Sequence, residues 1–183
     1  MSRNEQDLSR SSDGRDGTDR PDVEHPAGDP AKVVELLRDE RFAMITVLSP
    51  DQGLQSRPMS IQQVEDDGDL WFFISRSSEQ AQLIEADPRI NVAVSSKDTW
   101  ISVTGRGSIT RDQARIDELW NGFVDAWFPD GKEDPDVGLL RVDAESAEYW
   151  DTPGDRVASL ISFVKAKVTG EPYSAENATT EMP

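Results

Sequence analysis

The chain has 183 residues, of which 36% are hydrophobic and none is cysteine, and its formal net charge is −17. This length and hydrophobic content suit one folded domain, and the lack of cysteine excludes disulfides, thiolate metal sites and cysteine nucleophiles. The negative charge repels nucleic acid and anionic lipid, and the apolar runs are too short to span a bilayer, so we expect a cytoplasmic protein with no nucleic-acid or membrane partner.

Both ends of the chain have the composition of disordered segments. Residues 1–29 are rich in Asp, Arg, Ser, Gly and Pro and hold almost no large apolar side chains, so they cannot offset the entropy lost on ordering. The last residues are similar. The sequence therefore predicts a disordered acidic N-terminal tail (1–29), one folded domain (30–170) and a disordered C-terminal tail (171–183).

The folded part is expected to open with a short helix and to continue with three strands. Asp29 and Pro30 have the residue types of an N-cap and a first helical residue. Strand-forming residues then occupy 42–48, 56–64 and 70–75, and segments dense in turn formers separate them. Three strands joined by hairpins would make an antiparallel meander.

A second helix and two further strands are expected next. The capping-box pattern from Ser77 to Gln80 opens a helix that ends at Asp87. Strand candidates follow at 90–95 and 100–109. The second of these alternates apolar and polar residues, which indicates a strand with one buried face.

The rest of the chain is expected to add a helix, a strand pair and a last helix. A second capping box begins at Thr110, and the helix that follows it ends at Pro129. Strands are expected at 139–143 and 147–150, and an amphipathic helix over 157–168. Mostly sequential strands with helices at irregular places favour an antiparallel barrel, and the missing βαβ alternation excludes a Rossmann fold.

One place in this arrangement is suited to an anion. The strand at 70–75 runs directly into a helix start at Ser77 and Ser78, where unpaired N–H groups and a partial positive charge attract phosphate. Arg57 on the neighbouring strand and Arg76 just before the cap could reach the same anion. The sequence leaves an alternative open, in which Ser77 only caps its helix and the arginines pair with surface carboxylates.

Five tryptophans are the second feature. Trp100, Trp127 and Trp150 lie near the ends of predicted elements, where a ring could cover or edge a flat heterocycle, although such spacing also suits core residues. Trp71 and Trp120 are expected in the core or at a subunit interface.

Other classes of site have little support. The only histidine, His25, lies in the predicted N-terminal tail, which excludes histidine-dependent triads and histidine metal sites. With 36 acidic residues, carboxylates pair by chance, so they do not indicate a glycosidase or a carboxylate metal site. We expect no metal site, and no side chain stands out as a catalytic acid or base.

Four short motifs resemble the general stress protein branch of the pyridoxamine 5′-phosphate oxidase-like FMN-binding split barrels. They lie at 56–59, at 70–75 leading into the two serines, at 100–105 and at 148–151. The resemblance covers roughly residues 31–170. It implies a mainly β (α+β) fold, a six- to seven-stranded antiparallel split β-barrel with peripheral helices.

The resemblance also implies a cofactor site. The family forms homodimers with two FMN molecules at the subunit interface. Arg57 and Ser78 would contact the phosphate, the backbone of 72–75 would line the isoalloxazine, and tryptophans, some of them from the partner chain, would come near the ring. The candidate cofactor-binding residues are Arg57, Pro58, Met59, Phe72, Phe73, Ile74, Ser75, Arg76, Ser77, Ser78, Gln80, Trp100, Trp127 and Trp150.

Two residues depart from the family pattern. After the helix-cap serine the family commonly has basic residues, especially a lysine, whereas this chain has Glu79 and Gln80. A glutamate beside a dianionic phosphate is unfavourable unless it turns to solvent, and Arg76 is expected to compensate by reaching the phosphate from the other side of the turn.

The implied function is an FMN-dependent oxidoreductase of the stress response, with a small-molecule electron donor and an unidentified small-molecule substrate. The alternative is a non-catalytic flavin-binding sensor or storage protein. Pyridoxamine phosphate is not the expected substrate, because the sequence shows no second basic cluster for its phosphate.

Overall fold

The opening helix forms where the sequence predicts it. The computed structural model describes residues 28–96, 99–151 and 176–182, and its first helix is α1 (Pro30–Arg38). Asp29 accepts a hydrogen bond from the Ala31 amide at 3.0 Å, which confirms this residue as the N-cap. Val33 and Leu37 are buried on the helix face that packs on the sheet.

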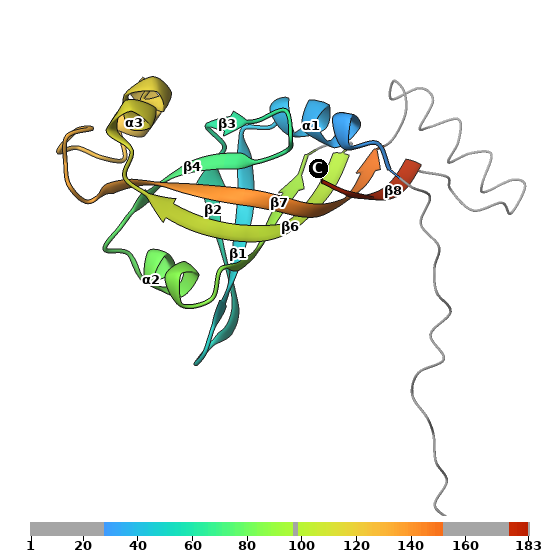
Figure 1. Cartoon of the computed structure of the whole chain (residues 1–183), viewed down its shortest axis with the longest axis horizontal. Helices are drawn as coiled ribbons and strands as arrows, with labels where there is room; N and C mark the ends of the chain where they lie inside the picture. The colour runs from blue at the N-terminus through green and yellow to red at the C-terminus, as the bar shows by residue number, and fades with distance from the viewer. Residues whose placement is uncertain (1–27, 97–98, 152–175, 183) are drawn as a thin grey trace, which may run out of the picture.

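An antiparallel sheet forms the body of the molecule. Its strand order is β2-β1-β5-β6-β7-β4-β3, and β8 pairs with β7 outside this path. In Figure 1 the long ribbons β6 and β7 run side by side from α3 to β8, with α1 drawn above them and α2 below. The strands are β1 (Phe42–Ser49), β2 (Gly53–Ser60), β3 (Gln63–Val64), β4 (Leu70–Ser75), β5 (Arg89–Ser95), β6 (Thr99–Thr110), β7 (Val137–Asp151) and β8 (Glu176–Glu181).

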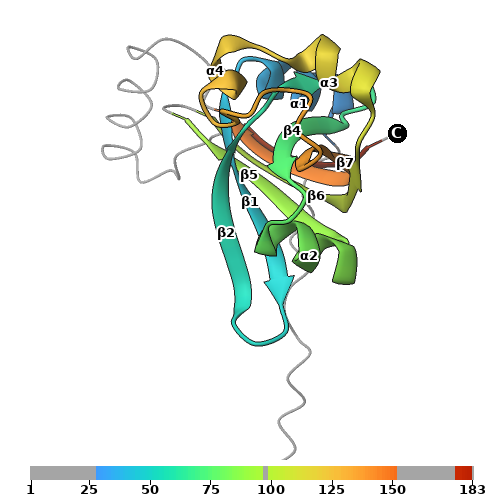
Figure 2. The same ribbon diagram turned by 90° about the vertical axis from the view of Figure 1, so that its left-hand side faces the viewer.

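This architecture confirms the predicted mainly β (α+β) split-barrel fold with peripheral helices. Figure 2 shows the β1–β2 hairpin extending away from the helices α3 and α4, while α2 lies beside β1. Within the described residues, no helix is long and apolar enough to cross a membrane.

The predicted meander is right in part: its two hairpins form, as β1 with β2 and as β3 with β4, but no single strand joins them. β4 pairs with β3 and β7, and not with β2. The predicted strand 56–64 is interrupted where the chain changes partner: the Ile61 amide donates to Arg41 O, beside β1, whereas the Gln62 amide donates to Trp71 O on β4. The residue pattern of a predicted strand does not show whether its two halves pair with different strands.

The predicted strand pair near the end of the domain is one continuous strand, β7. Opposite β6 its register shifts between Thr104 and Gly105, so that Glu145 has no partner and forms a bulge. A Cβ atom on Gly105 would stand 2.2 Å from Asp143 O. Glycine at this position therefore permits the close backbone approach that the bulge requires.

Two helix starts differ from the predicted capping boxes. The N-cap of α2 (Glu79–Ala86) is Ser78 rather than Ser77. Thr110 still belongs to β6, and Asp112 caps the next helix, α3 (Gln113–Leu119).

The predicted helix from residue 110 to Pro129 is not continuous. It ends at Trp120, whose backbone is extended, and a separate short helix α4 (Gly122–Asp125) follows. The Asn121 side chain accepts hydrogen bonds from the Phe123 and Val124 amides, so a second cap competes with continuation of the first helix.

The prediction of disorder after residue 170 is wrong for residues 176–182. These residues include β8, which pairs with β7 from Ser146 to Asp151. Thr180 and Met182 are buried, and Met182 joins the main core. The strand is held by ladder hydrogen bonds and one apolar anchor, which composition does not reveal. Residues 1–27 and the predicted helix at 157–168 lie outside the described residues.

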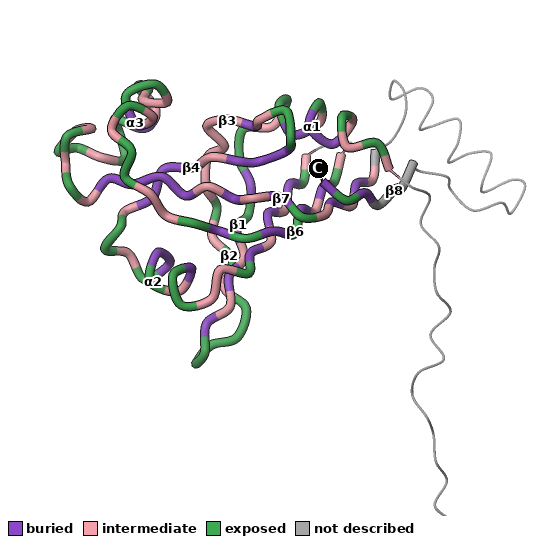
Figure 3. The backbone as a smooth tube through the Cα atoms, viewed as in Figure 1, coloured by how far each residue is buried: buried purple, intermediate pink, exposed green. Residues whose placement is uncertain are grey.

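The buried residues, which are purple in Figure 3, form two hydrophobic clusters. The larger part lies between the sheet and the helices α1 and α2 and includes Phe72, Val92 and Val103. The smaller part, around Phe73 and Ile116, lies under α3 and α4. Adjacent residues of β4 thus face different clusters, which ties the two parts together.

Candidate functional site

A cavity of about 560 Å³ lies where β2, the end of β4, the start of α2 and the helix α4 meet. This volume is in the range of small-molecule binding sites. The lining is dominated by apolar and aromatic side chains, with a few polar groups and, among the residues that the structure describes, no ionisable side chain. It consists of Phe42, Pro58, Met59, Ser60, Phe73, Ile74, Ser75, Ser78, Gln80, Phe123, Val124, Trp127 and Phe128.

The cavity brings together more than half of the residues predicted from sequence. Those that line it are Pro58, Met59, Phe73, Ile74, Ser75, Ser78, Gln80 and Trp127. The lining residues that sequence reasoning missed come mainly from the start of β1 and from α4. Phe123 lies four residues before Trp127 in the sequence, and this helical spacing is the signal that could have placed the two side chains together.

The turn between β4 and α2 presents free backbone donors beside this cavity. Ser75 O accepts from the Ser78 amide at 3.1 Å and from the Ser78 hydroxyl at 2.6 Å, and Ser78 Oγ accepts from the Ala81 amide at 3.2 Å. In the described part of the chain, these bonds leave the amides of Glu79 and Gln80 without an acceptor. Such groups at a helix start favour a negative or strongly accepting ligand atom.

Another donor of this turn is already bound to the carboxylate of Asp136, in the segment before β7. Asp136 accepts hydrogen bonds from the Ser75 hydroxyl at 2.5 Å and from the Ser77 amide at 2.7 Å. The bond from Ser75 is the main reason why the pKa of Asp136 lies below its ordinary value. Ser77 is therefore not free to bind a ligand in this arrangement, although its contact shows that the turn attracts an anion.

The two predicted arginines do not converge. Arg57 Nη2 lies 2.6 Å from Glu79 Oε2, and Arg76 Nη1 donates to Pro135 O at 3.0 Å. For Arg57, the alternative of pairing with a surface carboxylate is the one observed, and the expected compensation by Arg76 is not. The side chains of the Arg57–Glu79 pair are 41% and 55% exposed, so the pair adds little stability and a ligand anion can compete for the guanidinium.

Gln80 is the one polar side chain at the cavity that is deeply buried. It is only 6% exposed, and its Nε2 has no hydrogen-bond partner in the described residues. A buried donor without an acceptor costs about 1–3 kcal/mol. A ligand oxygen in the cavity would remove this cost.

Of the three tryptophans predicted near a ligand ring, only Trp127 lies at the cavity. It is 71% exposed and packs against Phe123, with ring centroids 6.4 Å apart. Trp100 and Trp150 face each other across β6 and β7. They lie roughly 40 Å of strand from Val137, the residue paired with Ser75.

Phe72 and the remaining tryptophans have structural positions. The Phe72 side chain is fully buried in the larger core cluster and does not line the cavity. Trp120 packs edge-on against Phe73 at 5.4 Å, as predicted for a core residue. Trp71 donates from Nε1 to Glu65 and lies under the Arg115 guanidinium.

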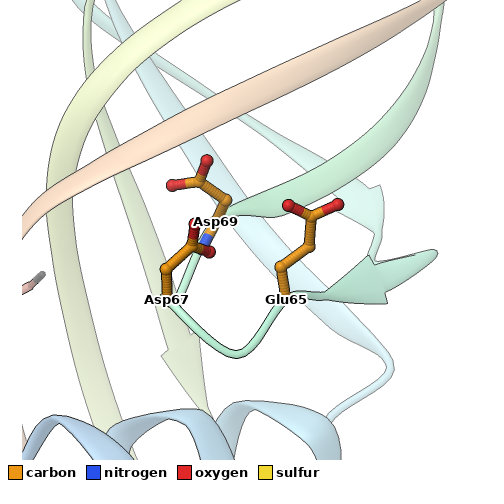
Figure 4. Close-up of side chains that lie close together, drawn as sticks. All are labelled: Glu65, Asp67 and Asp69. Carbon is orange, nitrogen blue, oxygen red and sulfur yellow. The ribbon is translucent and has the colours of Figure 1, made fainter.

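In an acidic cluster outside the cavity, two of the three carboxylates form ion pairs with arginines. Glu65, Asp67 and Asp69 bring their carboxylates together in the turn before β4 (Figure 4). Arg115 lies 2.6 Å from Glu65, and Arg141 lies 2.5 Å from Asp69. Because Asp69 also accepts from a backbone amide at 3.0 Å, the cluster serves to fix the β3–β4 turn against β7.

Comparison with known proteins identifies the family. A model of the pyridoxamine 5′-phosphate oxidase-like family matches residues 29–174. The chain belongs to this family. The match spans the whole sheet up to β7 and all the residues that line the cavity, and it confirms the resemblance inferred from the sequence motifs.

Individual relatives agree with this assignment. A candidate general stress protein 26 from Jannaschia sp. CCS1 has 30% identity and a TM-score of 0.70, over 82% of this chain and 96% of that chain. A general stress FMN/FAD binding protein from Xanthomonas citri has 34% identity and a TM-score of 0.60, over 69% of this chain and 90% of that chain. The protein bli-3 of Neurospora crassa is 30% identical over 149 residues, which are 75% of this chain and 71% of that protein.

Proposed function

We propose that the cavity binds FMN and that the chain acts as a flavin-dependent oxidoreductase on a small molecule. The observation that carries this proposal is the cavity itself, because it collects the predicted residues of β2, β4 and α2 around one apolar space. The relative from Xanthomonas citri, whose name includes FMN/FAD binding, supports the same ligand class.

The residues at the cavity fit a flavin. Phe73, Phe123 and Trp127 offer aromatic surface to a flat ring, while Ser78 and Gln80 offer hydrogen bonds to polar atoms. The free amides at the start of α2 and the Gln80 amide group suit the oxygen-rich end of the cofactor. When bound, the flavin supplies the electron transfer, and these residues hold and orient it.

A homodimer would complete this site. Phe42 and Trp127 line the cavity but are 51% and 71% exposed, so one side of the site is an uncovered apolar rim. A second copy of the chain placed on this rim would shield the ring from water. Trp100 and Trp150, which cannot reach the cavity of their own chain, would then be available from the partner.

The absence of ionisable side chains among the lining residues also favours a second candidate, a non-catalytic flavin-binding sensor or storage protein. Such a site holds a cofactor without offering an acid or a base to a substrate. The names of the general stress relatives support a role in stress responses for either candidate.

Absorbance spectra of the purified full chain, before and after titration with FMN, test the proposal. We expect bound flavin with an altered spectrum, and no uptake of micromolar FMN would overturn the proposal. Reduction of the bound flavin by NADPH or NADH and its reoxidation by an acceptor would support the enzyme, whereas flavin inert to every donor would support the sensor or store.

A cavity-filling variant locates the bound flavin. Ser60 lines the cavity at the end of β2, and Ser56 lies on the same strand face but outside the cavity. Ser60→Trp should abolish FMN binding, whereas the matched control Ser56→Trp should leave it unchanged. Equal binding by both variants would place the flavin elsewhere.

A further inference from the structure

The charged groups at the polar end of the cavity balance one another. Arg57 and Glu79 form an ion pair of 2.6 Å between β2 and the first turn of α2. Their neighbours Pro58, Ser78 and Gln80 all line the cavity, so the pair lies at its edge. The Arg57 guanidinium, which could otherwise bind a ligand anion, thus already has a counter-ion.

The second cation at this end is also balanced. Arg76 turns away to donate to Pro135 O, and the nearby Asp136 carboxylate takes the Ser77 amide. The two arginine and two carboxylate side chains therefore give this end no net positive charge, and the Glu79 carboxylate in the first turn of α2 also offsets the partial positive charge of the free amides there. The chain as a whole carries −17, and this charge further opposes the approach of an anion.

The deeply buried polar anchor of the cavity is uncharged. Gln80 is 6% exposed and its Nε2 has no partner among the described residues. An amide can donate to a hydroxyl, a carbonyl or a phosphate oxygen, and it does not require its partner to carry charge. Recognition by Gln80 therefore gives no advantage to a phosphate over a neutral oxygen.

We propose that the Arg57–Glu79 ion pair sets ligand selectivity at this site by cancelling the preference for a phosphate group. The site then accepts phosphate-free flavin, such as riboflavin, with an affinity close to its affinity for FMN. This inference depends on the proposed flavin binding. Glu79 acts as the specificity determinant, because it occupies the guanidinium that a phosphate would bind.

The test is the ratio of the affinities for FMN and riboflavin, measured by quenching of flavin fluorescence. In the native chain we expect a ratio near one. In Glu79→Gln, the released Arg57 can form charge-assisted bonds to phosphate, so we expect the ratio to rise about tenfold in favour of FMN at low salt. The increase should shrink in high salt, since the groups are half exposed.

A matched control separates this local effect from a general change of charge. Glu85 lies exposed on the same helix, away from the cavity, and Glu85→Gln makes the same change in net charge. This variant should leave the ratio unchanged. An equal rise in Glu85→Gln would overturn the assignment to Glu79.

Different binding results would contradict this inference and the proposed function. If native chain and variants bind both flavins but Glu79→Gln leaves the ratio unchanged, the ion pair does not set selectivity. A strong preference of the native chain for FMN would also overturn the inference. If no form of the chain binds either flavin, both the proposed function and this inference are wrong.

Discussion

Asp136 accepts a hydrogen bond of 2.5 Å from the Ser75 hydroxyl and thereby ties the end of β4 to the segment that leads into β7. Its second carboxylate oxygen accepts from the Ser77 amide at 2.7 Å. The same turn positions Ser78, which caps α2 and lines the cavity. The carboxylate of Asp136 therefore holds the polar end of the candidate site in place.

This contact predicts a pH dependence of stability. The hydrogen bond from Ser75 keeps the pKa of Asp136 below its ordinary value of 3.8. A lowered pKa in the folded state means that ionised Asp136 stabilises the fold above that value, and that this contribution is lost as pH falls through the lowered pKa. Urea unfolding should show native chain more stable than Asp136→Asn at pH 6, with the difference shrinking below about pH 4.

The control for this prediction is Asp130→Asn, a change at an exposed carboxylate of the same connecting segment. It removes the same charge without touching the β4–α2 turn, so its difference from native chain should vary little with pH. A difference between native chain and Asp136→Asn that stays constant down to pH 2 would contradict the role assigned to the carboxylate.

Gln80 should contribute to binding at the expense of stability. Gln80→Leu removes a buried donor that has no partner, so the unfolding free energy should rise by about 1 kcal/mol. The same change removes a hydrogen bond to the ligand, and flavin affinity should fall. Gln52→Leu, at an exposed position of the β1–β2 turn away from the cavity, should change neither quantity much. A Gln80→Leu chain that is less stable than the native one would show that the side chain has a structural partner.

Arg57 should affect the affinity for a phosphate-bearing ligand and have little effect on the stability of the fold. Arg57→Ala leaves the Glu79 carboxylate without its counter-ion beside the cavity, so this carboxylate should repel the phosphate and lower FMN affinity by about tenfold. Riboflavin affinity should fall less, because riboflavin has no phosphate. Isothermal titration with both ligands checks this, and thermal unfolding should show little change, since exposed ion pairs contribute little stability. Unchanged FMN affinity in a folded variant would make Arg57 a purely structural residue.

The strands were predictable where local signals decide them. Alternation of apolar and polar residues predicted the strand 100–109, which the structure extends by one residue at each end, and turn formers on each side predicted 70–75 with the bounds that the structure has. Pairing depends on distant segments, and this is why the change of partner at Ile61 and Gln62 was not predictable. Likewise, Asn121 caps α4 through its own side chain, and helical spacing alone does not reveal that competition.

The sequence predicted more than half of the residues that the cavity brings together, but it did not predict how the two arginines pair. The strand-to-helix junction at Ser78 followed from local sequence, and its residues do meet at one cavity. The partners of the arginines were not predictable, because the exposed side chains select among many carboxylates in a chain with 36 of them. Only the folded chain brings Glu79 of α2 within reach of Arg57 on β2.

The bulge in β7 predicts a strong effect at one glycine. Gly105→Ala would place a Cβ atom 2.2 Å from Asp143 O, a backbone atom that cannot move without disturbing β7. We expect a loss of about 1–3 kcal/mol in unfolding free energy, measured by urea denaturation. At Gly122 nothing lies within 4 Å of an added Cβ, so Gly122→Ala should be neutral or slightly stabilising in its helix. Equal stability of the two variants would mean that the bulge relaxes freely.

The exposed rim of the cavity predicts a dimer whose formation depends on Trp127. This side chain is 71% exposed beside the cavity, whereas Leu54 is 75% exposed at the tip of the β1–β2 hairpin and lines no cavity. If the rim is the subunit interface, Trp127→Ser should weaken dimerisation by at least about tenfold, because a buried aromatic anchor dominates such contacts. Leu54→Ser, which removes a comparably exposed apolar side chain, should not.

Sedimentation over a range of protein concentrations measures both effects on dimerisation. A native chain that remains monomeric at every concentration would exclude a two-chain site. Because Trp127 also touches the cavity, a flavin affinity that falls with no change in sedimentation would assign this residue to the ligand rather than to the interface.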